Sequence, residues 1–296
     1  MMKIAFMVIS HTDAEQLNNL VTRLAPNEFF ESKFFIHIDA KADIAQFESV
    51  ALRNYVQLTQ KRINVVRCGI SQVDAALELI RTVLQTQERF DRYVLITGQD
   101  YPVITNRELA ERLARDCEYM RAYKVTGNAM NNKVCRYYFY NKFLVGSKFK
   151  DLLRRSIQSI SRILSKKDTI EFDGNTWNIY YSSAYFAVSY GLLCDLYEKG
   201  CKKKYYKYFK TAICSDEMFF VTIAANGSFR SKLEIIDNPS HTLLDNSAIT
   251  YFDYQDRPVV LTEQDYDKIV ASGKMFARKF SSADSVALMN LLNKKE

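Results

Sequence analysis

The stretch Tyr93-Val94-Leu95-Ile96-Thr97-Gly98-Gln99-Asp100-Tyr101-Pro102 decides how this chain is expected to fold. Its first five residues are β-branched or aromatic apart from one leucine, as in a strand that is buried on both faces. Gly98 and Pro102 then mark a turn. A short, continuously apolar strand of this kind is typical of a parallel sheet that is covered by helices on both sides.

The same alternation of strand and helix patterns extends toward the N-terminus. Buried strands are expected over Lys3 to Ile9 and Phe34 to Ile38, and a third candidate covers Ile63 to Arg67. Apolar residues recur at helical spacing from His11 to Leu24 and from Val73 to Leu84. The alternation predicts an α/β fold with a mainly parallel central sheet flanked by helices.

The composition is that of an ordinary globular protein. Hydrophobic residues make up 48% and charged residues 25% of the 296 residues, and only 9 Gly and 4 Pro are present. We therefore interpret residues 1–296 as a single domain without a low-complexity linker. The formal net charge of +7 favours phosphorylated or polyanionic partners, or an anionic membrane surface. Nucleic acid is not an expected partner, because the cations are scattered and no recognised motif occurs.

The remaining global features indicate the compartment. The N-terminal apolar run is interpreted as a strand rather than a signal peptide, because no small-residue cleavage site follows it. No stretch approaches the length of a transmembrane span. The 6 cysteines are irregularly spaced without a C-x-x-C pair, which argues against zinc and favours reduced thiols. We expect a cytoplasmic protein.

Polar residues follow the predicted strands at their carboxyl ends. His11 follows the first strand, Asp39 follows the second, and Asp100 follows the strand that ends at Thr97. Each alone could be a loop or cap residue, but together they are expected to line a nucleotide-sized cleft. The sequence contains neither G-x-G-x-x-G after the first strand nor G-x-x-x-x-G-K-[ST], so neither a dinucleotide-binding enzyme nor a P-loop nucleotidase is indicated.

Adjacent carboxylates occur in Ile213-Cys214-Ser215-Asp216-Glu217-Met218-Phe219-Phe220. We expect Ser215 to cap a helix whose first turn carries Asp216 and Glu217, so that the helix N-terminus stabilises their charges. A carboxylate held in this way can act as a general base. The alternative is that the acidic residues serve helix capping alone.

Several segments, in this order along the chain, carry a family resemblance. They are Phe35–Lys41, Ser71–Leu77, Tyr93–Pro102, Ser182–Ser189, Asp216-Glu217 and Phe276–Phe280. Together they resemble the core-2/I-branching β-1,6-N-acetylglucosaminyltransferase family, glycosyltransferase family 14, over about His11 to Phe280. Because no membrane anchor is evident in the sequence, the chain resembles a soluble, bacterial-type member of this family.

The resemblance implies a GT-A-like nucleotide-sugar fold and an inverting reaction with a UDP-sugar donor. It also implies that no divalent metal and no other cofactor is needed. By position, Glu217 matches the catalytic base of the family, while Arg257 and Lys279 match the cations that hold the donor diphosphate. Fixed cations can neutralise the departing diphosphate in place of a metal.

The resemblance also assigns the remaining contacts. Asp39 matches a carboxylate near the uridine. His11 and Asp100 follow predicted strands at the same edge of the sheet, and we expect them to bind the uridine with Asp39. Trp177 and Glu118 lie where contacts with the acceptor are expected.

Local alternatives exist for the charged motifs. Asp265-Tyr266-Asp267 matches the metal-binding D-x-D pattern, but its surroundings read as a capped helix start, and we interpret it as structural. Lys279 could instead belong, with Arg278, to a solvated charge pair between two buried phenylalanines.

Residues 149–167 form a basic amphipathic pattern. Phe149, Leu152, Leu153, Ile157, Ile160 and Leu164 fall on one helical stripe. We hypothesise that this helix docks on an anionic membrane surface and brings the enzyme to a lipid-linked glycan. The alternative is a surface helix packed on the core.

These observations predict an inverting, metal-independent transferase that moves N-acetylglucosamine from UDP-GlcNAc to a hydroxyl of a surface glycan. The expected acceptor position is the 6-hydroxyl of a galactose-type residue. The alternatives are a UDP-xylose-dependent xylosyltransferase of the same family and a non-catalytic module that binds glycans or nucleotides.

Overall fold

The computed structural model describes residues 1–125, 131–138, 166–236, 247–253 and 259–295. Its largest sheet is built around β1 (Met2–Ser10), which pairs in parallel with β2 (Phe30–Ile38) and with β4 (Arg92–Thr97). β3 (Val56–Leu58) continues the sheet in parallel beyond β2, and β10 (Phe186–Val188) pairs antiparallel with β4 at the other edge. The predicted α/β class with a mainly parallel sheet is confirmed.

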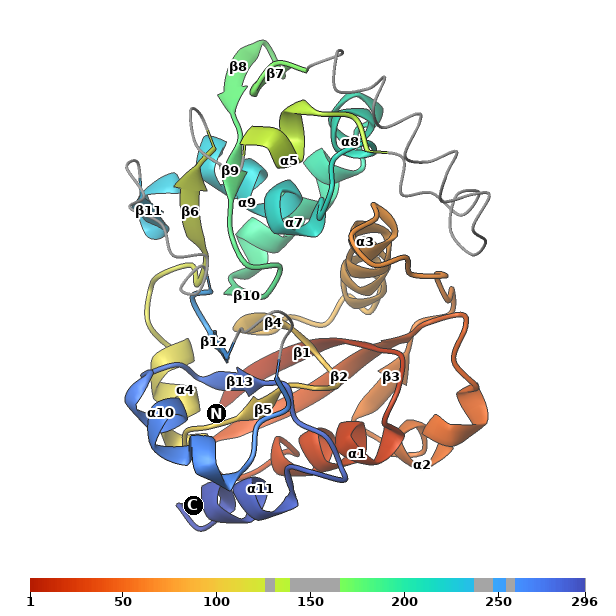
Figure 1. Ribbon diagram of the computed structural model, residues 1–296, viewed down its shortest axis with the longest axis vertical. Helices are drawn as coiled ribbons and strands as arrows, with labels where there is room; N and C mark the ends of the chain where they lie inside the picture. The colour runs from red at the N-terminus through yellow and green to blue at the C-terminus, as the bar shows by residue number, and fades with distance from the viewer. Residues whose placement is uncertain (126–130, 139–165, 237–246, 254–258, 296) are drawn as a thin grey trace.

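One face of the central sheet is covered by α1 (Ala14–Arg23), α2 (Glu48–Ala51) and α4 (Asn106–Leu113) (Figure 1). Phe6 of β1 and Leu20 of α1 are both fully buried in this layer. The helix predicted between His11 and Leu24 is therefore present, and its apolar side packs on the sheet.

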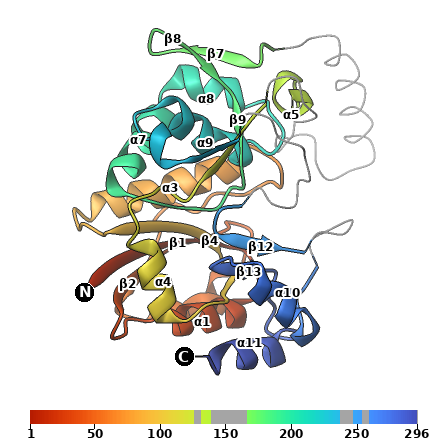
Figure 2. The same cartoon turned by 90° about the vertical axis from the view of Figure 1, so that its left-hand side faces the viewer.

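The opposite face is covered by α3 (Ser71–Gln85), α7 (Tyr190–Gly200) and α9 (Asp216–Asn226) (Figure 2). Met7 of β1 and Leu79 of α3 are fully buried there. Since successive strand residues point to opposite faces, β1 is buried on both sides, which accounts for its continuous apolar sequence.

Smaller sheets flank this core. β13 (Phe276–Arg278) lies between β12 (Thr250–Phe252) and β5 (Tyr101–Pro102). The other strands are β6 (Arg121–Lys124), β7 (Thr169–Phe172), β8 (Asn175–Asn178), β9 (Tyr180–Tyr181) and β11 (Glu234–Ile236). The other helices are α5 (Asn131–Cys135), α8 (Lys203–Phe209), α10 (Tyr266–Ala271) and α11 (Val286–Asn293), with short 3-10 turns at Ile44–Phe47, Arg230–Lys232 and Glu263–Asp265.

The strand predicted over Ile63 to Arg67 is wrong. The structure has no regular element there, and the edge strand is β3, which lies earlier in the chain. The backbone of Ile63 is bonded elsewhere, because its N–H donates to His37 Nε2 at 2.8 Å and its carbonyl accepts from the Ala40 N–H at 3.0 Å. A loop and a side chain therefore satisfy these groups instead of a strand ladder.

Gly98 sets the close approach of the turn after β4 to the end of β1. A Cβ at Gly98 would lie 2.6 Å from Ser10 Oγ and 3.1 Å from Ser10 Cβ. We expect Gly98→Ala to lower the free energy of unfolding by about 1 to 3 kcal/mol, as for other overpacked sites. Urea denaturation would measure the change.

Ser10→Ala supplies the matched background for this test. It removes the hydroxyl that the new methyl group would meet, so the Gly98→Ala penalty should be smaller in that background. Equal penalties in both backgrounds would show that the contact with Ser10 is not the cause.

Candidate active site

Glu217 lies in the first turn of α9, which begins at Asp216 as predicted. The expected side-chain cap by Ser215 is wrong. Ser215 has helical backbone angles, and its hydroxyl donates to the carbonyls of Phe209 at 3.0 Å and Ala212 at 3.1 Å. Because the hydroxyl is used to brace the preceding turn, it does not reach the free N–H groups of α9.

A lysine from a distant part of the chain holds the Glu217 carboxylate. Lys133 Nζ lies 3.0 Å from Glu217 Oε2 and 4.9 Å from the centre of the Tyr181 ring. Burial alone would lower the pKa of Lys133, but the Glu217 carboxylate and the two nearby cysteines together outweigh this effect, and the pKa is raised. Both side chains keep 28% of their surface exposed, so the pair borders solvent.

Asp216 differs from its neighbour. Its Oδ2 accepts a hydrogen bond from Gln72 Nε2 at 3.0 Å, and its Oδ1 is buried with no hydrogen-bond partner among the described residues. Desolvation, together with the negative charge of Glu217, raises the pKa of Asp216 to about 8. At pH 7 Asp216 is therefore mostly protonated, and the charged carboxylate of the pair is that of Glu217.

A second group of charges lies where β4 leads into β5 and β13 ends. Asp100 is fully buried; its Oδ2 accepts from Thr97 Oγ1 at 2.9 Å, and its Oδ1 faces Arg278 Nε at 3.6 Å. The Arg278 guanidinium stacks over the Tyr185 ring at 4.6 Å. Arg278 is only 9% exposed, so the alternative of a solvated Arg278-Lys279 pair is wrong. Desolvation raises the pKa of Asp100 although Arg278 opposes it.

Lys279 follows directly, and its backbone is fixed by hydrogen bonds with Val259 at 3.3 Å and Leu261 at 2.8 Å. Its side chain is half-buried, and no carboxylate within the described residues forms an ion pair with it. Burial, and then the charge of Arg278, lowers the pKa of Lys279. A half-buried ammonium beside another cation is a favourable environment for an anion.

His11 and Asp39 border the same group. Desolvation, followed by the charge of Lys279, lowers the pKa of His11, although the imidazole itself is exposed. Asp39 is 3% exposed; its carboxylate accepts from the Lys41 N–H at 2.9 Å and lies 3.4 Å from Lys41 Nζ. The carboxyl ends of β1, β2 and β4 thus bring His11, Asp39 and Asp100 together, as the parallel sheet requires.

Two connections join this group to Glu217. The segment between β9 and β10 contacts both, because Ser182 N–H donates to the Glu217 carbonyl at 2.8 Å while Tyr185 lies under Arg278. On the other side, the Arg67 charge contributes to the lowered pKa of Lys279, and its neighbour Cys68 accepts a backbone hydrogen bond from Cys214. The segments that carry the Glu217 carboxylate and the cations are therefore neighbours in the fold.

Glu118 and Trp177 are buried and interact with other residues of the protein. Glu118 is 4% exposed, accepts from the Ser189 N–H at 2.8 Å and lies 3.8 Å from Arg92. Trp177 is 5% exposed, and its ring packs 4.7 Å from the ring of Phe172. Their packing and hydrogen bonds account for both residues, and a role in acceptor binding stays a prediction.

Two predicted features fall outside the described residues. These are Arg257 and residues 149–165 of the basic amphipathic segment. The end of that segment is described, and Lys166 turns inward. Its Nζ donates to the Tyr208 carbonyl and to Thr211 Oγ1, both at 3.0 Å, and burial lowers its pKa to about 8. Lys166 is therefore not part of a cationic surface. Among the described helices, none combines the length and apolarity needed to cross a bilayer.

Asp265 of the D-x-D pattern caps a helical segment, which is the structural role predicted for this stretch. Asp265 Oδ2 accepts from the Thr262 N–H at 3.0 Å and closes a capping box at the start of the helical segment. In the part of the chain that the structure describes, no group of three or more His, Cys, Asp and Glu side chains could hold a metal ion.

Comparison with known proteins identifies the family. The model of the Core-2/I-Branching enzyme family matches residues 4–270. The chain belongs to this family. No curated protein matches the chain. The crystal structure of S. aureus TarS is similar with a TM-score of 0.38 and 15% identity over 80% of this chain, and the chain spans 36% of that protein.

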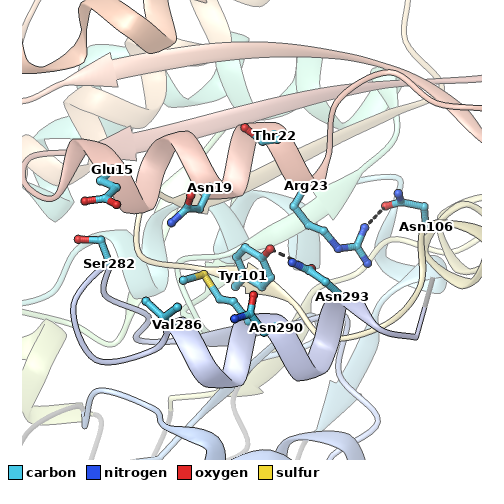
Figure 3. Close-up of a pocket in the computed structure, with 11 residues that line it drawn as sticks. Glu15, Asn19, Thr22, Arg23, Tyr101, Asn106, Ser282, Val286, Asn290 and Asn293 are labelled. Carbon is cyan, nitrogen blue, oxygen red and sulfur yellow. Dashed lines mark hydrogen bonds between the residues drawn. The ribbon is translucent and has the colours of Figure 1, made fainter.

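Core-2/I-branching enzymes are glycosyltransferases. The described residues also form a groove that the site residues above do not line. That groove, of about 500 Å³, lies between α1 and α11 (Figure 3). Tyr101 and Asn293 are hydrogen-bonded at 3.0 Å in its wall, and Arg23 donates to Asn106 at 2.7 Å. None of the predicted site residues lines it.

Several residues beside Glu217 and Arg278 are not among those predicted from the sequence. Lys133 stands in a stretch without a periodic pattern, and no local signal connects it with Glu217. Gln72 and Tyr185 lie in segments that carry the family resemblance, but only the fold places them beside Asp216 and Arg278. Arg278 also lies in such a segment, and only the fold places it beside Asp100 and Tyr185.

The buried Asp216 predicts a specific pH dependence of stability. Its pKa is raised above its ordinary value of 3.8, so its contribution to stability is fully present below that value and is lost as the pH rises through about 8. Asp216→Asn removes the ionisation. We expect the variant to gain several degrees in Tm relative to the wild type at pH 8 and little at pH 4.

Thermal unfolding followed by circular dichroism between pH 4 and pH 8 would measure this difference. Asp267→Asn is the matched control, because Asp267 is exposed in the first turn of α10. A Tm difference between the Asp216 variant and the wild type that does not change with pH would overturn the assignment.

Proposed function

We propose that this Core-2/I-branching enzyme transfers N-acetylglucosamine from UDP-GlcNAc, with inversion and without a divalent metal, to a hydroxyl of a surface glycan. The acceptor position that fits the family resemblance is the 6-hydroxyl of a galactose-type residue. The observation that supports the proposal is that the segment between β9 and β10 contacts both Glu217, a carboxylate that borders solvent, and Arg278, which precedes Lys279.

Glu217 supplies the base in this proposal. A sugar hydroxyl is a poor nucleophile at neutral pH, so its proton must pass to a positioned group as the oxygen attacks the anomeric carbon. Lys133 binds Oε2 of Glu217 and leaves Oε1 to accept that proton. The neutral state of Asp216 keeps a second negative charge away from the sugar, where it would repel the donor diphosphate.

Lys279 and Arg278 supply the charge that the leaving group needs. The bond from the anomeric carbon to the diphosphate breaks as the acceptor oxygen approaches from the opposite side, and the phosphates gain negative charge. Lys279 has no carboxylate partner among the described residues and can therefore bind a phosphate oxygen directly. Arg278 is held by Asp100 and Tyr185, and its buried positive charge adds to the attraction for the diphosphate.

The donor assignment rests on the family resemblance. Neither UDP-xylose as the donor nor a lipid-linked acceptor is favoured by a specific contact, so a panel of donors has to separate the first alternative. A non-catalytic binding module would keep donor affinity without turnover. His11, Asp39 and Asp100 at the strand ends are the proposed boundary of the uridine site.

The first test is UDP release from a panel of UDP-sugars in the presence of EDTA. UDP-GlcNAc should be turned over most rapidly, and Glu217→Gln should lower the rate by about 10²- to 10⁴-fold because the base is lost. Glu263→Gln, at an exposed position of another turn, is the control and should retain the rate. Loss of the activity in EDTA, or an unchanged rate in Glu217→Gln, would contradict the proposed mechanism.

Lys279→Ala tests the diphosphate contact separately. Loss of one charged hydrogen bond should weaken UDP binding by about 10- to 100-fold, and the remaining affinity should depend less on salt. Isothermal titration with UDP at low and high ionic strength would measure both effects. Lys294→Ala, an exposed lysine after α11, is the control. Equal UDP affinity in both variants would place the diphosphate elsewhere.

A further inference from the structure

Cys68 and Cys214 lie side by side beneath the proposed base. Cys68 precedes α3 and Cys214 precedes α9, and the Cys214 N–H donates to the Cys68 carbonyl at 2.9 Å. Both residues have left-handed backbone angles, with φ of 62° and 51°. This backbone hydrogen bond brings the two residues into contact, and both are half-buried. The pair is thus held in contact by the backbone and remains reachable from solvent.

The two thiols differ in charge. The neighbouring Cys214 side chain lowers the pKa of Cys68 to about 6, and Arg67 contributes in the same direction. The Cys68 side chain and burial raise the pKa of Cys214. At pH 7 Cys68 is therefore the thiolate and Cys214 the proton donor. Burial instead raises the pKa of the cysteines Cys135 and Cys201.

We propose that Cys68 and Cys214 form a reactive dithiol site that reacts with hydroperoxides and closes to a disulfide. The Cys68 thiolate attacks one peroxide oxygen, the O–O bond breaks, and a sulfenic acid forms while the other oxygen leaves as hydroxide, which takes a proton from solvent to become water. Cys214 Sγ then attacks Cys68 Sγ, and its proton leaves with the hydroxyl group as water. In sum, two thiols lose two electrons and one hydrogen peroxide is reduced to two waters.

This site is coupled to Glu217 through short connections. The Glu217 N–H donates to the Cys214 carbonyl at 3.1 Å. Gln72 joins the other side, because it accepts from the Cys68 N–H at 2.6 Å and donates to Asp216 at 3.0 Å. A disulfide constrains the turn that starts α9 and removes the Cys68 negative charge that acts on Lys133. Oxidation therefore changes the backbone position and the electrostatic environment of Glu217.

Peptide mapping tests the chemical step directly. Trypsin releases residues 68–81 and 211–230, and each of these peptides contains one cysteine. After treatment of the full chain with hydrogen peroxide, we expect the two peptides to be linked, with the summed mass less two hydrogens, and to separate with dithiothreitol. In the reduced protein, iodoacetamide should label Cys68 about tenfold faster than Cys201 at pH 7. Unlinked peptides, or slower labelling of Cys68, overturn the proposal.

UDP release tests the coupling to Glu217, and only this part rests on the proposed function. Hydrogen peroxide should lower the rate at least fivefold in the wild type and in Cys201→Ser, reversibly with dithiothreitol, but not in Cys68→Ser or Cys214→Ser. A complete disulfide with an unchanged rate contradicts the coupling. An inactive reduced wild type would contradict the proposed function, while the peptide map would still decide the dithiol site.

Discussion

The parallel pairing of β1 with strands on both sides is the constraint on which the rest of this structure depends. β1 is in register with β2 along its whole length and with β4 from Ile4 to Ile9. Since all three strands run in the same direction, the loops that follow them leave from one edge of the sheet. The direction of the strands alone therefore places His11, Asp39 and Asp100, which are distant in the sequence, at the same edge of the sheet.

The buried pair of Asp100 and Arg278 ties the C-terminal part of the chain to that edge. A carboxylate with no solvent exposure requires a partner, and Arg278 on β13 supplies the opposite charge at 3.6 Å. Removal of either member would leave a buried charge behind, which is why such pairs fix geometry more than they add stability. The pair thereby fixes the position of the next residue, the half-buried Lys279, at the ends of the strands.

Much of this arrangement could be predicted from local sequence, because buried strands and amphipathic helices leave periodic patterns. The strand over Tyr93 to Thr97 is an example. Ile63 to Arg67 also contains β-branched residues but is a loop, since Ile63 bonds to His37 and Ala40 instead of to a neighbouring strand. The prediction that the Ser215 side chain caps α9 failed for a related reason. A hydroxyl group has several possible hydrogen-bond partners, and tertiary contacts decide which one it uses. Lys133 left no local signal, as its partner lies 84 positions away.

The adjacent residues Asp216 and Glu217 show how the fold gives the same chemical group two different properties. Successive residues on a helix point about 100° apart, so one carboxyl faces the interior beside Gln72 while the next reaches solvent beside Lys133. Burial then keeps Asp216 neutral and the negative charge stays on Glu217. An acidic pair in a sequence is ambiguous between capping and chemistry, and the orientation of α9 against the sheet is what separates the two residues.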